Sequence, residues 1–203
     1  MPPSSRRTYA VLLGAAGGLD SEVGSDIALL DAIDAVDEIH VWVSGQDVDA
    51  IRDLVSTNSW AKVAAVQSGQ GTRDAAIFDA LTAIRPAAGD EDLVLIADVE
   101  RRSLTESSAS SCLSVAAEQG AAILGSQVAG DVILADHAGK LAGQPREGGT
   151  FLAAGLLVTQ FGRMFDLFDW ASTVAKGSID SPYRWSLSQL QAVVVPTDGR
   201  ERR

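Results

Sequence analysis

An aspartate and three arginines stand where they could hold a phosphorylated ligand. Asp98 directly follows an apolar run at residues 93–97, and a carboxylate there is a ready ligand for a hard cation such as Mg²⁺, which prefers oxygen donors and substrate phosphates. The forked donors of Arg73, Arg101 and Arg146 suit phosphate oxygens. The alternatives are a helix cap or turn residue for Asp98 and surface solubility for each arginine.

A glycine-rich turn is a second candidate for phosphate binding. The apolar residues 10–13 lead into a turn of small residues, namely Gly14, Ala15, Ala16, Gly17 and Gly18. Glycines let the backbone turn sharply and approach a ligand closely, and such a turn before a helix points N–H groups at a phosphate. The turn has neither the dinucleotide-binding nor the P-loop signature. A buried strand that merely ends in small residues is therefore the alternative.

The elements that position these residues follow from the apolar pattern. Strands are predicted at 9–13, 39–44, 63–67, 93–97, 121–126 and 192–195. Helices are predicted at 48–55, 73–84, 104–119, 161–174 and 183–190, and a first helix is capped at Ser25 and Asp26. This alternation indicates βαβ units and a mostly parallel α/β sheet covered on both faces.

Three candidate segments fall at one end of the predicted sheet. Ligands of parallel α/β sheets bind at the carboxyl ends of the strands. The turn at 14–18, the turn at 69–73 and the segment 98–101 each follow a predicted strand. We therefore expect a single binding rim.

Some segments are predicted to serve packing instead. The aromatic helix at 161–174 is expected to pack in the core or in a dimer interface. Cys112 is expected on the buried face of its helix, and His40 is expected inside a strand as a packing or solvent-facing residue. The stretch 131–149 combines a short apolar run with several glycines, which favours an extended arm or hairpin outside the core.

Composition excludes several functional classes. The 203 residues are expected to form one domain over 1–203, and a net charge of −11 argues against nucleic-acid binding, which needs a basic face. One cysteine and two separated histidines argue against a disulfide, a cysteine-based metal cluster and a zinc site. No apolar stretch suits a membrane span and the start lacks a secretory core, so a soluble cytoplasmic protein is predicted.

Taken in order, the motifs resemble those of the 2-C-methyl-D-erythritol 4-phosphate cytidylyltransferase family, within the sugar nucleotidyltransferases. The family opens with a strand and Pro-Ala-Ala-Gly-x-Gly-x-Arg, whose first half is similar to LGAAGG at 13–18. Its Gly-Gly-x-x-Arg-x-x-Ser-Val-x-x-Gly-Leu motif looks like residues 68–81. Four more family motifs are matched in part by this chain. Residues 97–102 are similar to His-Asp-Ala-Ala-Arg-Pro, 131–134 to Asp-Thr-x-Lys, 145–148 to Asp-Arg-Glu-Gly, and 179–181 to Thr-Asp-Glu. The resemblance covers nearly the whole chain.

The resemblance implies a fold and a reaction. The fold would be a Rossmann-like, three-layer αβα domain with a protruding β-arm at 131–149 that clasps a second subunit of a homodimer. The phosphate of an acceptor alcohol, 2-C-methyl-D-erythritol 4-phosphate by resemblance, would attack the α-phosphate of CTP in isoprenoid precursor synthesis. A CDP-alcohol and pyrophosphate would form, and the protein would mainly position the reactants and neutralise charge.

The resemblance also assigns roles to individual residues. Asp98 would bind Mg²⁺ and, with Arg101 and Arg146, would form the catalytic set, Arg146 contacting the acceptor phosphate across the dimer. Nucleotide contacts would come from Gly14, Ala15, Ala16, Gly17, Gly18, Gly69, Arg73 and Ala76.

The chain also departs from the family pattern. Residues 19–24 contain no basic residue but add Asp20 and Glu22, which would repel a triphosphate at short range. Ala76 replaces a nucleotide-contacting serine and Leu134 replaces a lysine. None of the three lysines, Lys62, Lys140 and Lys176, falls at a lost position.

Three hypotheses remain at this point. The chain is a divergent cytidylyltransferase, or a catalytically impaired homologue that binds a nucleotide or a partner, or an unrelated doubly wound protein with another phosphate ligand. Removing one charge-stabilising donor from such a site costs roughly 10²–10³ in rate, so the missing basic residues favour the second hypothesis for activity. The family resemblance favours the first.

Overall fold

The computed structural model describes residues 6–14, 20–69, 72–99, 104–127, 134–135, 141–143, 151–174 and 190–197. Its helices are α1 (Asp20–Ala32), α2 (Val48–Asn58), α3 (Arg73–Ile84), α4 (Glu106–Gln119) and α5 (Phe161–Val174). Its strands are β1 (Thr8–Leu13), β2 (Glu38–Val43), β3 (Val63–Ser68), β4 (Leu93–Asp98), β5 (Ala121–Gln127), β6 (Leu134–Ala135), β7 (Leu141–Gly143), β8 (Phe151–Gln160) and β9 (Val193–Pro196).

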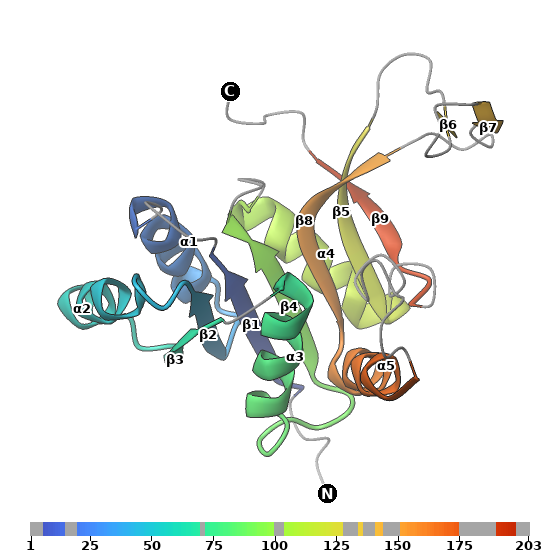
Figure 1. The fold of residues 1–203 in the computed structure, drawn as a ribbon. Helices are drawn as coiled ribbons and strands as arrows, with labels where there is room; N and C mark the ends of the chain where they lie inside the picture. The colour runs from blue at the N-terminus through green and yellow to red at the C-terminus, as the bar shows by residue number, and fades with distance from the viewer. Residues whose placement is uncertain are drawn as a thin grey trace, which may run out of the picture.

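A seven-stranded sheet in the order β3-β2-β1-β4-β8-β5-β9 forms the centre of the molecule (Figure 1). β1 pairs in parallel with β2 and with β4, and β2 pairs in parallel with β3. β9 pairs in parallel with β5 at the other edge. The predicted mostly parallel α/β sheet is therefore confirmed.

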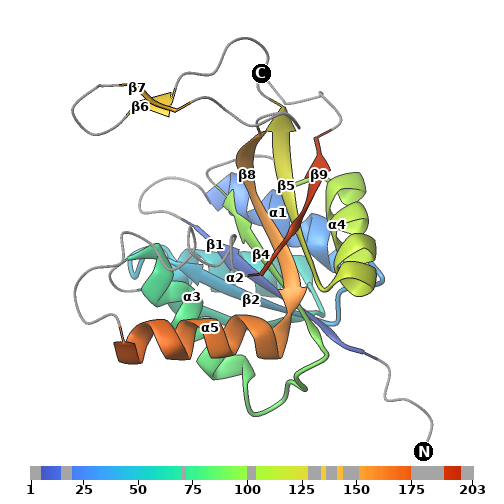
Figure 2. The same cartoon turned by 90° about the vertical axis from the view of Figure 1, so that its right-hand side faces the viewer.

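Helices cover both faces of this sheet (Figure 2). In β1, Ala10 and Leu12 belong to the core cluster with α1, α2 and α4, while Tyr9, Val11 and Leu13 belong to the cluster with α3 and α5. Alternate residues of a strand point to opposite faces, so a strand that is apolar throughout must be covered on both sides. The three-layer architecture follows from this pattern.

The first helix begins earlier than the sequence pattern predicts. The predicted cap, Ser25–Asp26, lies inside α1, which already starts at Asp20. A glycine inside a helical pattern weakens the helix prediction, but Gly24 has a packing role: a Cβ there would come within 2.7 Å of Leu54 Cδ2. Asp20 and Glu22 are thus part of the first turns of a helix.

The central strand β8 is the main departure from the predicted arrangement. It runs antiparallel to both β4 and β5, and it is not among the strands that the apolar pattern predicts. Leu156, Leu157 and Val158 are buried. Because both faces of this strand are covered, no polar alternation distinguishes it from other buried segments.

The predicted arm lies apart from the main sheet. β6 and β7 pair with each other, antiparallel, in a separate two-stranded sheet, and both views show them projecting beyond the ends of β5 and β8 (Figures 1 and 2). The expectation of a hairpin outside the core is confirmed for these described residues. The predicted short helix at 183–190 lies almost wholly outside the described residues.

Two packing predictions are confirmed. Phe161, Met164 and Phe168 of α5 are buried in the cluster shared with α3. Cys112 is completely buried in α4, and burial raises the pKa of its thiol to about 12. No helix in the described ranges is long and apolar enough to cross a membrane.

His40 occupies β2 with only 7% of its surface exposed. Burial lowers the pKa of its imidazole, and the hydrogen-bonding and charge effects of Glu38 oppose this shift only partly. His40 Nε2 lies 3.4 Å from Glu38 Oε2. The folded protein thus binds this proton more weakly than the unfolded chain does.

We predict that acidification weakens the fold through His40. Because the folded pKa is below the unfolded value of about 6.5, stability is lost as pH falls through about 6.5 and levels off below the folded pKa. Urea unfolding measures how the free energy of unfolding changes between about pH 8 and pH 5, roughly the range in which histidine titrates. His40→Asn should reduce the slope even if it lowers stability at every pH, and an unchanged slope would contradict the assignment.

Candidate functional site

The carboxyl ends of four strands meet at one rim. Leu13 of β1 is in register with Trp42 of β2 and with Asp98 of β4, and Val43 of β2 is in register with Ser68 of β3. The residues that follow β1, β3 and β4 therefore leave the sheet at the same edge. This confirms that the described parts of the three predicted segments share one edge of the sheet.

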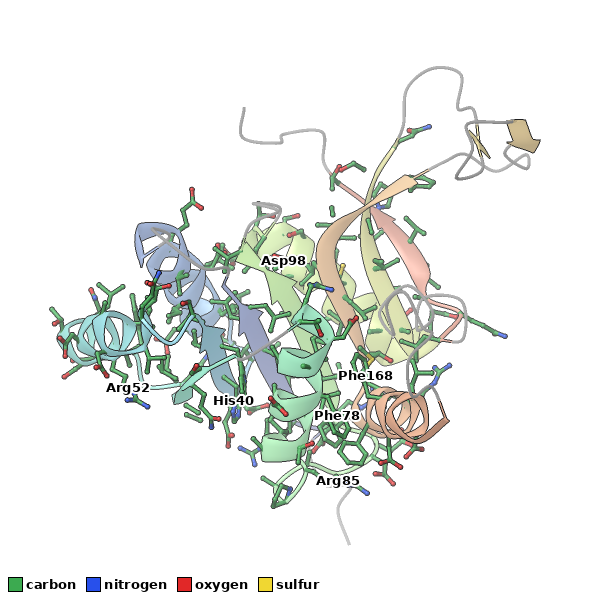
Figure 3. The ribbon with its side chains drawn as sticks, in the orientation of Figure 1. His40, Arg52, Phe78, Arg85, Asp98 and Phe168 are labelled. Atoms are coloured by element: carbon green, nitrogen blue, oxygen red, sulfur yellow. The ribbon has the colours of Figure 1, made fainter. Side chains whose placement is uncertain are left out.

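An ion pair at this rim joins Arg73 and Asp98. Arg73 Nε lies 3.1 Å from Asp98 Oδ2, and the two side chains are 30% and 11% exposed. Figure 3 shows Asp98 at the opposite end of the sheet from Arg85. The predicted nucleotide-binding arginine and the predicted metal ligand are therefore direct neighbours, an ion pair that the sequence did not reveal.

A capped helix start holds Arg73 in place. Thr72 precedes α3 with an extended backbone, and its Oγ1 accepts a hydrogen bond from the Ala75 N–H at 3.3 Å. Such a cap satisfies one of the free N–H groups of a helix start. Arg73 is the first helical residue, so the cap fixes the point from which its side chain reaches Asp98.

Gly69 and Ala76 form a tight contact beside this pair. The Gly69 N–H donates to the Val43 carbonyl at 2.9 Å, which ties the turn to the end of β2. A Cβ on Gly69 would lie 3.3 Å from the Ala76 Cβ. A larger residue at either position would push α3 away from the rim, so small residues here serve the packing of the helix.

Gly14 is required for a similar reason. Its N–H donates to the Trp42 carbonyl at 2.9 Å, and a Cβ would lie 2.9 Å from Val43 Cγ1 and 3.4 Å from Val23 Cγ2. The backbone of β1 thus leaves the sheet in direct contact with β2 and α1. The rest of the predicted turn lies outside the described residues, namely Ala15, Ala16, Gly17 and Gly18.

The structure brings together the described part of the predicted site. Gly14, Gly69, Arg73, Ala76 and Asp98 all lie at the same rim. Arg101 and Arg146 lie outside the described residues, and their roles stay predictions.

The charges around the rim are mostly acidic in the described part of the chain. Glu22 lies in the first turn of α1, where the helix dipole favours a carboxylate. Asp74 lies in the first turn of α3, and its Oδ1 is buried without a hydrogen-bond partner among the described residues. Lys62 lies at the opposite end of the sheet, where its Nζ donates to the Ile33 carbonyl at 2.7 Å.

The rim fits a metal ion that arrives with a phosphorylated ligand. The described residues contain no group of three or more His, Cys, Asp or Glu side chains that could hold a metal ion by themselves. Mg²⁺, however, is commonly bound through one or two carboxylates together with substrate phosphates and water. Asp98 would supply the carboxylate in that mode of binding and would have to exchange its contact with Arg73 for the metal.

Comparison with known proteins identifies the family. The family model of 2-C-methyl-D-erythritol 4-phosphate cytidylyltransferase matches residues 23–154. No curated protein matches the chain significantly in sequence.

Solved structures share the fold at low sequence identity. The 4-diphosphocytidyl-2C-methyl-D-erythritol synthase of Anaerococcus prevotii superposes with a TM-score of 0.82 at 15% identity, covering 98% of this chain and 92% of its own. A second synthase of that description gives 0.73 at 18% identity, covering 98% and 92%. The Francisella tularensis 2-C-methyl-D-erythritol 4-phosphate cytidylyltransferase gives 0.66 at 16%, covering 97% and 93%.

The structural likeness confirms the α/β fold, and the sequence match excludes an unrelated doubly wound protein. Because the family model covers more than half of the chain, this protein belongs to the 2-C-methyl-D-erythritol 4-phosphate cytidylyltransferase family, whose activity serves isoprenoid synthesis.

Proposed function

We propose that the rim binds CTP with Mg²⁺ and that the chain transfers CMP to a phosphorylated alcohol, 2-C-methyl-D-erythritol 4-phosphate by family membership. The observation that carries this proposal is the position of Asp98. Asp98 ends β4 at the shared rim and is only 11% exposed, and its Oδ2 lies 3.1 Å from Arg73 Nε. The Arg73 guanidinium could contact a phosphate in place of Asp98. Gly14 and Gly69 bring backbone close to the same place.

The proposed reaction needs positioning more than covalent help from the protein. A phosphate oxygen of the acceptor forms a bond to the α-phosphorus of CTP, and the bond from that phosphorus to pyrophosphate breaks. Asp98 would hold Mg²⁺, which would neutralise charge on the triphosphate. Arg73 would turn from Asp98 to a phosphate oxygen, and Arg101 and Arg146 would contact the triphosphate and the acceptor.

The second candidate function is binding without turnover. It is supported by the electrostatics of the described rim, where Arg73 is the only Lys or Arg and already faces a carboxylate. An impaired homologue would keep the fold and bind a nucleotide or a partner protein. Pyrophosphate release separates the two candidates, because only the enzyme produces it.

We also propose that the arm at 131–149 pairs with a second copy of the chain. The described strands of this arm, β6 and β7, hydrogen-bond only with each other and stand away from the main sheet. Light scattering should give twice the chain mass for the intact protein and a monomer after deletion of 131–149. A monomeric intact protein would contradict this assembly.

The activity test uses Asp98. With CTP, Mg²⁺ and 2-C-methyl-D-erythritol 4-phosphate, the protein should release pyrophosphate, and Asp98→Ala should lower the rate by roughly 10²–10³, the typical cost of a lost charge-stabilising group. Asp53→Ala, an exposed position on α2, is the matched control and should keep the full rate. If the wild-type protein released no pyrophosphate, the result would contradict the enzymatic function and leave binding without turnover.

The Arg73–Asp98 contact can be measured as a coupling free energy. In a double-mutant cycle by urea unfolding, Arg73→Ala and Asp98→Ala should couple by about 1–2 kcal/mol, because the pair is more buried than ordinary surface pairs. The control pair is Arg52–Asp49 on α2, at 3.4 Å but 58% and 95% exposed, for which we expect about 0–0.5 kcal/mol. Equal coupling in both pairs would contradict the special status of the rim pair.

A further inference from the structure

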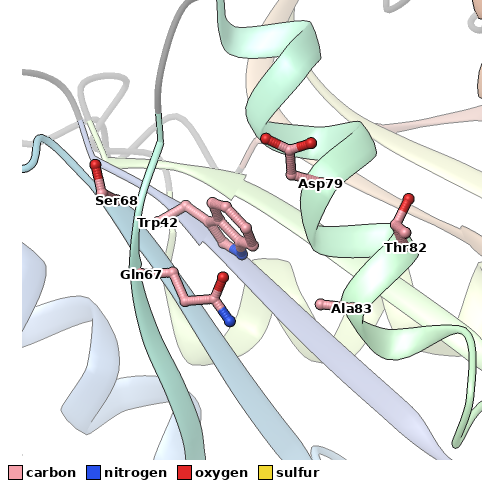
Figure 4. Close-up of a pocket in the computed structure, with 6 residues that line it drawn as sticks. All are labelled: Trp42, Gln67, Ser68, Asp79, Thr82 and Ala83. Atoms are coloured by element: carbon pink, nitrogen blue, oxygen red, sulfur yellow. The ribbon is translucent and has the colours of Figure 1, made fainter.

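An open groove lies between α3 and the ends of β2 and β3 (Figure 4). It has a volume of about 560 Å³, within the usual range for small-molecule sites. We call it the Trp42 groove, and its walls are Trp42, Gln67 and Ser68 from β2 and β3 and Asp79, Thr82 and Ala83 from α3.

The groove shares Trp42 and Ser68 with the strand ends at the rim, but it contains none of the residues proposed for the transfer reaction. Ala76 lies one helical turn from Arg73 and one turn from Asp79, so it stands between the ion pair and the groove. Its contact with Gly69, where a Cβ would have only 3.3 Å, leaves no room for a ligand to pass between α3 and the turn. A molecule in the groove would therefore contact residues that the proposed transfer reaction does not use.

Four polar groups of the groove make no hydrogen bond with the described part of the protein. Trp42 is only 5% exposed, and its Nε1 is buried without an acceptor. Gln67, the register partner of Trp42 on β3, extends its amide beside the indole in Figure 4. No hydrogen bond of the described structure involves the Gln67 amide, the Ser68 hydroxyl or the Asp79 carboxylate, whereas the Thr82 hydroxyl donates to the Phe78 carbonyl at 2.8 Å.

A buried donor without an acceptor is costly and rare in native proteins. Gln67 is half-buried and its side chain can rotate. A ligand that pairs with the Gln67 amide would hold it with the carbonyl oxygen toward the covered indole N–H, which would then have an acceptor. The groove is therefore a better match for a ligand with hydrogen-bonding edges than for a purely apolar one.

The chemistry of the walls points to one class of ligand. A side-chain amide can pair with both a donor and an acceptor on the edge of a nucleobase, and a flat ring packs well against an indole. A carboxylate such as Asp79 suits the hydroxyls of a ribose. No Lys or Arg lines the groove and Asp79 is acidic, so a phosphate would be unfavourable there.

We propose that the Trp42 groove binds an uncharged nucleoside, either free or as the nucleoside end of a larger molecule. The base lies over the small exposed part of Trp42 with its edge on Gln67, and the ribose hydroxyls donate to Asp79. This site does not rest on the proposed transferase activity.

The indole N–H of Trp42 gives a direct readout. In the ¹⁵N–¹H spectrum of the full chain, the signal of Trp42 is identified among the four tryptophans by its absence from Trp42→Phe. Titration with adenosine should shift this signal downfield in a saturable way, because the N–H gains an acceptor. Adenosine 5′-monophosphate should bind more weakly, and a signal that does not move with adenosine would overturn the proposal.

Variants test the two ends of the ligand. Asp79→Ala, at an exposed helical position, should weaken adenosine binding about tenfold or more, as expected for lost hydrogen bonds to a charged group. The same change should leave binding of 2′,3′-dideoxyadenosine unaltered, and Asp53→Ala should leave both unaltered. Equal loss for both nucleosides would contradict the assignment of Asp79 to the ribose.

A last variant separates the groove from the rim. Asp98→Ala removes the proposed metal ligand and should abolish Mg²⁺-dependent CTP binding while the adenosine-induced shift of Trp42 persists. Loss of that shift in Asp98→Ala would place the nucleoside at the rim and overturn the proposal. If the wild-type protein showed the adenosine-induced shift but bound no CTP, the result would support the groove and contradict only the proposed transferase function.

Discussion

The parallel pairing of β1 with both of its neighbours is the constraint on which the site depends. Leu13 is held in register with Trp42 on one side and Asp98 on the other, so the strand ends cannot slide past one another. A shift of one residue would turn every side chain of β1 to the opposite face. The same pairing that buries the apolar faces therefore also fixes where a carboxylate leaves β4 and where the turn after β1 begins.

Close packing then determines which residue types can stand at the rim. Gly14 has Val43 within 2.9 Å of the place where its Cβ would be, and Gly69 has Ala76 within 3.3 Å. The sequence predicts Gly14 in a phosphate-binding turn, and the family resemblance implies a nucleotide contact for Gly69. The structure gives each of them a packing role that is sufficient by itself. The proposed ligand binding at the rim therefore depends on charge, and the described structure provides the Arg73–Asp98 contact as a charged feature there.

Much of the fold follows from the sequence because its signals are local. α3 begins at Arg73 and ends at Ile84 as predicted, with a threonine cap at one end and Pro86 shortly after the other. β8 was missed because an antiparallel strand between two buried neighbours carries no alternation, and the start of α1 was missed because Gly24 serves a contact with Leu54 from a distant part of the chain. Long-range packing of this kind leaves no mark in a local pattern.

The candidate site was predictable to a similar extent. The described residues of the rim share one edge of the sheet as predicted, because each follows a parallel strand. The direct contact of Arg73 with Asp98 depends on the crossing of α3 over the sheet, which spacing alone does not specify. The sequence also could not predict the cluster of polar groups around Trp42, because Trp42 and Gln67 become neighbours only through the register of β2 and β3.

Calorimetric titration of the protein with CTP and the other nucleoside triphosphates, with and without Mg²⁺, tests the central claim most directly. If the rim is a nucleotide site in which Asp98 receives a metal that arrives with the phosphates, CTP should bind selectively, in the micromolar range, and only when Mg²⁺ is present. Absence of binding for every triphosphate under both conditions would show that the rim keeps the geometry of its family without the function.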